Sequence, residues 1–400
     1  MVRITFSLGA ILCAVAFSIP LLRPIAVVSA FQPHLQPHLS PPLSPLPPAI
    51  AARYDIWGKA IVRRTLNWFH RPGHVRLVEK IPPDATAASA RKTDHGAFVW
   101  PQSMVLLMLA AEVQRYPHRA PMLQFFVHSL RGYWRMHKGL GAYADLPAPA
   151  PLDRFYDDNE WLAWGYLRAY RATHDRAYLH RARTIFRFIR SGESAQLGGG
   201  IFWLEQNRNT KNTCSNGPAI IDALKLYTDT GKTSYLIMAK KLYAWVNKNL
   251  QDHRTGLYFD HMNLDGKVQK TLWSYNSASM LIADCQFYRI THRHVFLRRA
   301  VALARAARRQ WVNPASGAVA NPAPFNWVLV DAFFHLYRCS GQKRWLHCDV
   351  RIMDYVHQHC MDRRGLYGSQ WTNAPDKNTP RRLIDQAAAG QCYFFLGQRR

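Results

Sequence analysis

Acidic residues are scarce in this chain of 400 residues. It contains 25 Asp and Glu against 52 Lys and Arg, which gives a formal net charge of +27 at pH 7. Such an excess of positive charge favours association with polyanions such as nucleic acid, anionic lipid or acidic wall polymers. The basic residues are spread along the chain, without a single basic block or a recognised nucleic-acid-binding module. We therefore expect no specific nucleic-acid partner, and instead electrostatic association with an anionic cell surface.

The common signatures of metal and nucleotide sites are also missing. The seven cysteines form no Cys-x-x-Cys pair, and the histidines form no cluster with ligand spacing. No glycine-rich phosphate loop follows a strand pattern. We expect no metal ion and no cofactor. Cys13 lies close to the N-terminus, and several of the other cysteines, such as Cys285, lie in apolar helical runs, which favours buried free thiols over disulfides.

Residues 1–30 have the pattern of a secretory signal sequence. Arg3 supplies the positive start, the stretch from Ile4 to Leu22 is mostly apolar, and Val28-Ser29-Ala30 offers a small-residue cleavage site. The apolar stretch is close to membrane-spanning length, so an uncleaved N-terminal anchor is the alternative. Residues 31–52 are rich in proline and predict a semi-rigid linker. Either version predicts a protein that is secreted or associated with the cell surface.

From residue 53 onward, apolar residues recur with the spacing of helices. No convincing alternating run predicts a large sheet. The pattern predicts about twelve helices, at 53–70, 101–116, 120–137, 158–174, 177–191, 216–229, 233–249, 273–290, 294–311, 325–338, 343–360 and 383–397.

A weak internal repeat groups these helices into pairs. Four helices open with an aromatic residue followed by leucine, and an aliphatic residue follows seven positions after the aromatic one; the openings are Tyr178-Leu179, Tyr235-Leu236, Phe296-Leu297 and Trp345-Leu346. Each unit is then one helical hairpin. An open solenoid would show the same periodicity, although the mixed loop lengths argue against regular stacking. We predict one all-α domain over residues 53–398, an (α/α)6 barrel built from six helical hairpins.

The stretch with the most chemical information is Phe155-Tyr156-Asp157-Asp158-Asn159-Glu160-Trp161. Two carboxylates stand side by side at or near the expected start of a helix, and glycoside hydrolysis requires two carboxyl groups beside one sugar bond. In the alternative, Asp157 and Glu160 form a capping box, in which Asp157 caps the helix and Glu160 reaches back to it. A cap does not require Asp158, which points about 100° away from Asp157 around the helix.

This stretch resembles the signature of glycoside hydrolase family 76, the endo-α-1,6-mannanases, in which an aromatic residue, two adjacent Asp and two further residues precede Trp. Other segments resemble the family in the same order, from about Phe98 to near the C-terminus: Gly199-Gly200-Ile201-Phe202-Trp203, Lys211-Asn212, Ser215-Asn216-Gly217, Tyr258-Phe259-Asp260, Thr271-Leu272-Trp273-Ser274-Tyr275-Asn276, Gly365-Leu366-Tyr367 through Trp371, and Leu383-Ile384-Asp385-Gln386-Ala387. Glu160 departs from the family, which usually has a small residue there.

The resemblance implies a secreted glycosidase with an (α/α)6 barrel that cleaves α-1,6-mannosidic linkages in α-mannan by a retaining mechanism. It implies that Asp157 is the nucleophile and Asp158 the acid/base; the sequence by itself decides neither these roles nor the carboxyl separation that distinguishes retention from inversion. We expect a further set of residues to contact sugar: Tyr156, Trp203, Asn216, Asp260, Trp273, Tyr275, Asn276, Trp371 and Gln386.

Two other functions remain open at this point. Some relatives with this fold transfer the sugar to another sugar and so build cell walls, and a surface protein that binds glycans without cleaving them is the second alternative. The intact pair Asp157 and Asp158 argues against the second. The chain ends in Gln398-Arg399-Arg400, so we expect no hydrophobic tail that would direct lipid anchoring. We also expect a monomer.

Overall fold

Twelve α-helices make up most of the part of the chain that the computed structural model describes, namely residues 46–70, 76–86 and 96–397. The predicted signal sequence and most of the predicted linker lie outside the described residues. Each helix that we expected from the sequence is present: α1 (Pro48–Phe69), α3 (Val99–Arg115), α4 (Ala120–Ser129), α5 (Tyr156–Thr173), α6 (Arg176–Ser191), α7 (Thr213–Thr230), α8 (Thr233–Asn249), α9 (Ser274–Thr291), α10 (His294–Trp311), α11 (Ala323–Ser340), α12 (Lys343–His359) and α13 (Leu383–Leu396).

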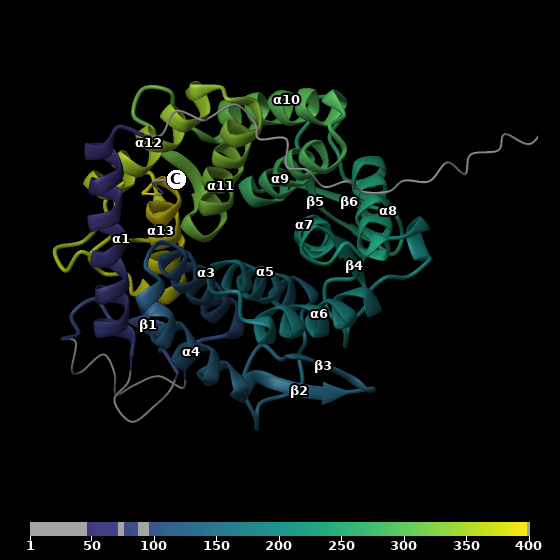
Figure 1. Cartoon of the computed structure of the whole chain (residues 1–400), viewed down its shortest axis with the longest axis horizontal. Coiled ribbons are helices and arrows are strands. Elements are labelled where there is room, and N and C mark those ends of the chain that lie inside the picture. Colours follow the sequence, from purple (N-terminus) through teal and green to yellow (C-terminus); the bar gives the residue numbers. More distant parts are fainter. Residues whose placement is uncertain (1–45, 71–75, 87–95, 398–400) are drawn as a thin grey trace, which may run out of the picture. The chain divides into compact units, whose positions relative to one another are not determined.

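The helices form two concentric rings (Figure 1). In the inner ring, α3, α5, α7, α9, α11 and α13 each pack against the next, and α13 packs against α3, which closes the ring. One outer helix packs against each inner helix: α4 on α3, α6 on α5, α8 on α7, α10 on α9, α12 on α11, and α1 on α13. The fold is therefore the predicted (α/α)6 barrel and not an open solenoid. The sixth helical pair consists of α1 and α13, the first and last described helices, which pack against each other.

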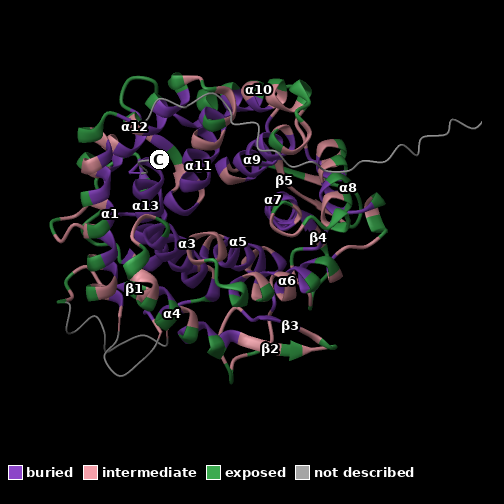
Figure 2. Cartoon of the chain, in the orientation of Figure 1, coloured by how far each residue is buried: buried purple, intermediate pink, exposed green. Residues whose placement is uncertain are grey.

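Burial distinguishes the two rings (Figure 2). Every residue of α13 is buried, and so are nearly all residues of the inner helix α3. The outer helix α6 buries only the side that carries Tyr178, Ala182, Ile185 and Ile189, and its basic residues lie toward solvent. A helix that is apolar all round has to be enclosed, whereas an amphipathic one covers a core with one stripe. The sequence therefore specifies which helices form the inner wall.

Four inner helices pass to their outer partners through turns of two residues. The last residue of each inner helix is Thr or Ser, and its hydroxyl accepts a hydrogen bond from the backbone amide two positions later. The residue between them has the left-handed conformation that ends a helix; these residues are His174, Gly231, His292 and Gly341. Each aromatic–leucine opening follows such a turn. We call this end of the barrel the turn end.

Short strands gather at the opposite end, where the inner helices begin, and we call it the strand end. Seven of these strands lie in three antiparallel sheets: β1 (Lys80–Ile81) with β9 (Arg381–Arg382), β4 (Thr210–Asn212) with β5 (Phe259–Asn263) and β6 (Val268–Leu272), and β7 (Val319–Pro322) with β8 (Gln370–Trp371). Most of them lead directly into an inner helix, so this end of the barrel has ordered backbone around the mouth of the inner ring.

One predicted helix is wrong in its extent. We expected a helix over 120–137, but α4 ends at Ser129, and a 3-10 turn (Leu130–Tyr133) leads into a hairpin of β2 (Trp134–His137) and β3 (Leu140–Tyr143). The hairpin turn consists of Lys138 and Gly139, which both have positive φ. A two-residue turn of this kind matches the twist of paired strands, so the Lys-Gly dipeptide was the signal that the sequence analysis missed.

The cysteines agree with the prediction of free thiols. All six cysteines in the described part of the chain are free, and all but Cys339 are buried. Cys13 lies outside the described residues. None of the helices within the described ranges is both long and apolar enough to cross a membrane.

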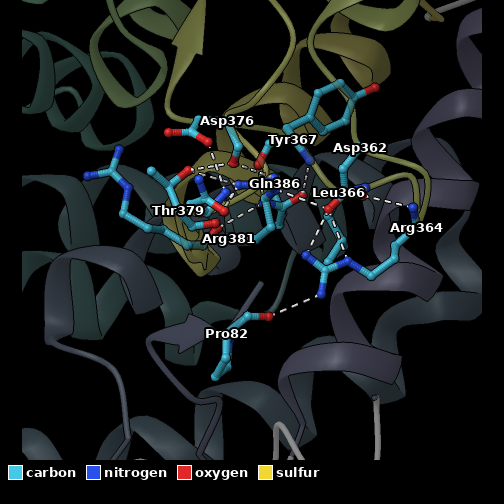
Figure 3. A network of polar contacts seen from close by, with 11 residues as sticks. Pro82, Asp362, Arg364, Leu366, Tyr367, Asp376, Thr379, Arg381 and Gln386 are labelled. Carbon is cyan, nitrogen blue, oxygen red and sulfur yellow. Dashed lines mark hydrogen bonds and ion pairs between the residues drawn. The ribbon is translucent and has the colours of Figure 1, made fainter. Parts of the chain in front are cut away.

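A polar network holds the last loop of the barrel in place (Figure 3). Arg364 and Arg381 both donate to the Asp362 carboxylate, at 2.8–3.0 Å. Arg364 also donates to the Pro82 carbonyl, and Arg381 to the carbonyl of Thr379. Burial acts to raise the pKa of Asp362, but the Leu366 amide and Arg364 outweigh it and hold that pKa below its ordinary value. The network therefore joins α12, the approach to α13 and the first strand.

We expect Asp362→Asn to lower the free energy of unfolding by about 2–4 kcal/mol at pH 7, because it leaves two guanidinium groups without their shared acceptor. The pKa of Asp362 is lower in the folded protein than in the unfolded chain. Its contribution is therefore complete above the unfolded pKa and is lost as the pH falls through the folded pKa. Denaturant unfolding at pH 7 and at about pH 3 tests this; an equal difference from wild type at both pH values would contradict it.

Candidate active site

The two adjacent aspartates lie at the strand end, in the first turn of an inner helix. Asp157 and Asp158 are the second and third residues of α5, and the N-cap is Phe155, which makes no side-chain capping bond. The capping-box alternative is therefore wrong: Asp157 lies inside the helix, and Glu160 is buried and its carboxyl oxygens make no hydrogen bond to the N-cap. The helix begins here because Phe155 is extended and pairs with Leu204, while the Tyr156 amide donates to the Trp203 carbonyl at 2.9 Å.

Asp157 is held by two donors. The indole Nε1–H of Trp203 donates to Asp157 Oδ2 at 2.9 Å, and the Asp158 amide donates to Asp157 Oδ1 at 3.1 Å. Trp203 is 38% exposed and packs against Phe155 with 4.9 Å between ring centroids. The free amides at a helix N-terminus also favour negative charge. The carboxylate of Asp157 is thus fixed in position at the mouth of the barrel.

The pair has the electrostatics of an acid and a base. Burial raises the pKa of Asp157 to about 6, against the opposing hydrogen bond from Trp203. Burial also raises the pKa of Asp158 well above its ordinary value, and the charge of Asp157 and then that of Asp145 raise it further. Because the charge of Asp157 acts on Asp158, the proton that the pair retains near neutral pH resides on Asp158. Asp157 is then the ionised partner.

The second residues of three neighbouring inner helices lie close together at the strand end. They are Asp157 on α5, Cys214 on α7 and Tyr275 on α9. Cys214 lies close to Asp157 and to Tyr275 and is 4% exposed. Burial raises the pKa of the Cys214 thiol well above its ordinary value, and the charges of Asp157 and Asp260 add to that effect. The thiol therefore stays protonated, and it can donate a hydrogen bond to the carboxylate.

Aromatic rings from three other positions form a wall at the same end. Phe325, on α11, stacks on Tyr275 with 4.2 Å between ring centroids and on Trp100 at 6.1 Å. Trp273 meets Phe325 edge-on at 5.4 Å. We refer to Trp100, Trp273, Tyr275 and Phe325 as the aromatic wall. Flat apolar rings that are held rigidly can pack on the apolar faces of sugar rings.

The predicted contact residues separate into two groups. Trp203, Asp260, Trp273 and Tyr275 lie at the strand end and are at least partly exposed. The others are buried: Tyr156, Asn216, Asn276, Trp371 and Gln386. Both side-chain polar atoms of Asn276 lack a hydrogen-bond partner among the described residues, so its amide is available to a group that the protein does not provide.

Two of the buried residues, Asn216 and Gln386, belong to a hydrogen-bond pattern that recurs in every inner helix. The fourth residue of every inner helix bonds to the backbone of the segment that follows the preceding outer helix. Asn216 pairs with both the N–H and the C=O of Ile201, and Gln386 does the same with Tyr367. The other members of the set are Gln102, Asn159, Ser277 and Asn326. The amide groups of Asn216 and Gln386 are thus committed to the backbone, and we leave both out of the candidate site.

Sequence reasoning missed three members of the site. Cys214, Trp100 and Phe325 occupy the second or third positions of inner helices, as Asp157 and Asp158 do. The beginning of each inner helix was therefore the signal that could have found them. Among the described residues, no group of three or more His, Cys, Asp and Glu could hold a metal ion.

Glu160 lies one helical turn below Asp157, inside the barrel. It is fully buried, and neither of its carboxyl oxygens has a hydrogen-bond partner in the described part of the chain. Asp222, on α7, shares both properties. Burial raises the pKa of Glu160 well above its ordinary value, and the charges of Asp157, Asp222 and Asp158 raise it further. Glu160 is therefore a neutral acid in the folded protein.

We expect Glu160→Gln to stabilise the protein by about 2 kcal/mol at pH 8 and to change its stability little near pH 4. The folded state holds a proton on Glu160 that the unfolded state releases. The contribution of Glu160 to wild-type stability therefore falls as the pH rises from the pKa of Glu160 in the unfolded chain toward its pKa in the folded protein. A glutamine avoids that loss. Denaturant unfolding at both pH values measures it. Glu193→Gln, at a partly exposed position, is the matched control, and a gain that is equal at both pH values would refute the assignment.

The comparisons with known proteins agree with this architecture. The family model described as "Glycosyl hydrolase family 76" matches residues 59–323. Mannan endo-1,6-alpha-mannosidases of Candida glabrata and Saccharomyces cerevisiae are each 30% identical, over 125 and 124 residues. These alignments cover 29% and 28% of this chain. They cover only 28% of the length of each curated relative.

Solved structures match over most of the chain. A family 76 α-mannanase of Bacteroides thetaiotaomicron superposes with a TM-score of 0.80 and 26% identity, covering 87% of this chain and 97% of that one. An inactive variant of an α-1,6-mannanase of Salegentibacter sp., solved with α-1,6-mannotriose, gives a TM-score of 0.72 at 21% identity, covering 86% of this chain and 99% of that one. At 87% of this chain, the first likeness covers more of it than the family-model match over residues 59–323.

Proposed function

Because this chain belongs to glycosyl hydrolase family 76, we propose that it cleaves α-1,6-mannosidic bonds in mannan-type polysaccharide. The observation that carries the proposal is the pair Asp157 and Asp158 in the first turn of α5 at the mouth of the barrel, where burial and the charge of Asp157 raise the pKa of Asp158. The curated relatives with mannan endo-1,6-alpha-mannosidase activity in their names, and the neighbour solved with α-1,6-mannotriose, support the choice of substrate.

The mechanism that we propose is a retaining double displacement. Asp157 attacks the anomeric carbon and forms a glycosyl-enzyme ester, while Asp158 gives its proton to the departing glycosidic oxygen. Asp158 then accepts a proton from water, which attacks the same carbon and releases Asp157 as a carboxylate. Trp203 and the Asp158 amide hold Asp157 in line through their hydrogen bonds.

Sugar binding is assigned to groups around the pair at the strand end. We propose that Trp203 and the aromatic wall pack on sugar faces and that Asp260 and the amide of Asn276 bond to sugar hydroxyls. Asp260 is partly exposed on β5, and Asn276 has unused polar atoms beside Tyr275. A buried amide without a partner is costly unless a ligand satisfies it, so Asn276 is the member of this set with the clearest need for one.

The test is incubation of the purified protein with unbranched α-1,6-mannan. Shortened products mean hydrolysis, and lengthened products mean transfer to a second sugar. Unchanged polymer that sediments with the protein would mean binding alone and would refute the proposal. The anomer that appears first, followed by NMR, distinguishes retention from inversion. The control is the double variant Asp157→Asn and Asp158→Asn, which should leave the polymer intact.

We also propose that residues 1–30 direct export. The positively charged start, the apolar stretch and the small-residue cleavage site support this. Fractionation of cells that express the full chain is the test, and recovery of the full-length protein from the cytosol would contradict it.

A further inference from the structure

The turn end of the barrel is strongly basic. The two-residue turns that join α5 to α6, α7 to α8, α9 to α10 and α11 to α12, together with the adjoining helix ends, carry seven exposed Lys and Arg: Arg176, Lys232, Arg289, Arg293, Arg338, Lys343 and Arg344. Asp175 is the one exposed acid in the same stretches. None of the seven basic residues forms an ion pair with an acid within the described ranges. This end of the protein therefore presents charge without internal compensation.

Helix stability explains only two of these residues. Arg289 and Arg338 lie in the last turns of α9 and α11, where a positive charge opposes the negative end of the helix dipole. The other five lie at the N-cap or in the first turn of an outer helix, where the dipole disfavours positive charge. None of the four outer helices, α6, α8, α10 and α12, has an acid in its first turn. The helix dipole therefore disfavours the positions of all five cations, which are Arg176, Lys232, Arg293, Lys343 and Arg344.

Apolar side chains are exposed among these cations. Ile237, the fifth residue of α8, is 66% exposed, and Val295, the second residue of α10, is 37% exposed. A soluble acidic polymer offers no apolar region in which these aliphatic side chains could be buried. A bilayer offers phosphate groups to the cations and an apolar region to the aliphatic groups at the same surface.

The polypeptide also enters the barrel at this end. Arg115, at the last residue of α3, pairs with Asp55 near the start of α1, and Asp55 also lies against Gly397 at the end of α13. The start of α1 therefore lies at the turn end. The first described residues of the chain, which precede α1, therefore lie at the turn end as well.

We propose that the turn end is a docking surface for an anionic lipid bilayer. Arg176, Lys232, Arg293, Lys343 and Arg344 meet lipid phosphates, and Ile237 and Val295 enter the interface between the headgroups. The aspartate pair lies at the opposite end of α5, a helix of 18 residues that is about 27 Å long. Docking in this orientation directs the mouth of the barrel away from the membrane, toward polysaccharide outside it.

The experiment measures binding of the full chain to vesicles at about 0.1 M salt, where charges within a Debye length of about 10 Å act. Vesicles of phosphatidylcholine with phosphatidylglycerol are compared with phosphatidylcholine alone. One variant replaces the five cations of the docking surface by Gln. The matched control replaces five exposed basic residues in the later halves of the outer helices: Arg187, Arg190, Lys248, Arg305 and Arg309. Both variants have the same net charge and keep residues 1–45.

We expect the docking-surface variant to bind anionic vesicles at least tenfold more weakly than wild type, and the control to stay within about threefold. Both should keep the wild-type thermal unfolding midpoint and the wild-type activity on short mannan substrates. Equal losses in the two variants would show an effect of net charge alone, and an unchanged docking-surface variant would show no role for this face; either result overturns the proposal.

A second pair of measurements tests the choice of lipid. The double variant Ile237→Ser and Val295→Ser should bind anionic vesicles more weakly than wild type at about 0.5 M salt, and should bind soluble polyphosphate as wild type does. If the five-cation variant loses polyphosphate binding while wild type ignores the vesicles, the face binds an acidic polymer and the lipid assignment is wrong.

Discussion

Asp157→Asn should reduce turnover on α-1,6-mannan by about 10⁴-fold or more while the thermal unfolding midpoint stays within a few degrees of wild type. Asparagine has nearly the same volume as aspartate, and its single amide oxygen can still accept one of the two hydrogen bonds, from Trp203 Nε1 or from the Asp158 amide. What it lacks is the charge that attacks the anomeric carbon. A 10⁴-fold loss corresponds to about 5.5 kcal/mol of transition-state stabilisation.

The structure also explains why the fold should tolerate this change. Asp157 is the second residue of α5 and not its N-cap, so no capping bond is lost. Its charge favours the helix N-terminus, but burial beside Asp158 opposes ionisation, and the two effects offset each other. Michaelis constants and circular dichroism complete the measurement. A variant that keeps more than a tenth of wild-type turnover would remove Asp157 as the nucleophile.

The repeated signals in the sequence predicted the helical pairs, while closure of the ring was implied by the family resemblance. The four openings from Tyr178-Leu179 to Trp345-Leu346 each mark the start of an outer helix, and the inner helices that precede them are buried along most of their length. What failed was local: the Lys138-Gly139 turn ends the segment that we had predicted as one helix. A turn that depends on two left-handed residues competes with apolar periodicity, and periodicity alone does not reveal it.

The site was predictable only in part, for a different reason. Asp157, Asp158 and Trp203 come from motifs whose residue types indicate their chemistry. In the structure, a hydrogen bond joins Trp203 to Asp157. Asn216 and Gln386 have equally suitable chemistry, but in the structure they bond to backbone segments. Whether an amide at the fourth position of a helix faces a ligand or a neighbouring strand depends on tertiary packing. Trp100 and Phe325 come from different hairpins, and only closure of the ring brings them together.

Glu160 links the site to the interior of the barrel. Its charge, if it ionised, would lie one helical turn from Asp157 and would further disfavour the nucleophilic carboxylate. Burial keeps it neutral, so its proton prevents a third negative charge beside the pair. The chain therefore accommodates a buried carboxylic acid beside the pair at a cost in stability at high pH.

Asp158→Asn should show losses that depend on the leaving group. On mannan, whose leaving group is a sugar hydroxyl, turnover should fall by about 10²–10⁴-fold, because the departing oxygen needs the proton that Asp158 donates. On an aryl α-1,6-mannobioside with a dinitrophenol leaving group, that oxygen departs without a proton, and the first displacement should be nearly as fast as in wild type. The glycosyl-enzyme should then accumulate, because asparagine cannot activate water, and a burst of phenol should precede a slow steady state.

The pH dependence provides an independent check on the same variant. In wild type, kcat/KM on mannan should rise through the pKa of Asp157, at about 6, and fall as Asp158 loses its proton at higher pH. In Asp158→Asn, the burst rate on the activated substrate should keep the rise near pH 6, because Asp158 is uncharged while Asp157 titrates, and should lose the alkaline fall. Azide, a small nucleophile that needs no general base, should restore the steady-state rate and yield an α-mannosyl azide. Equal losses on both substrates, with no burst and no effect of azide, would assign the acid/base role to a residue other than Asp158.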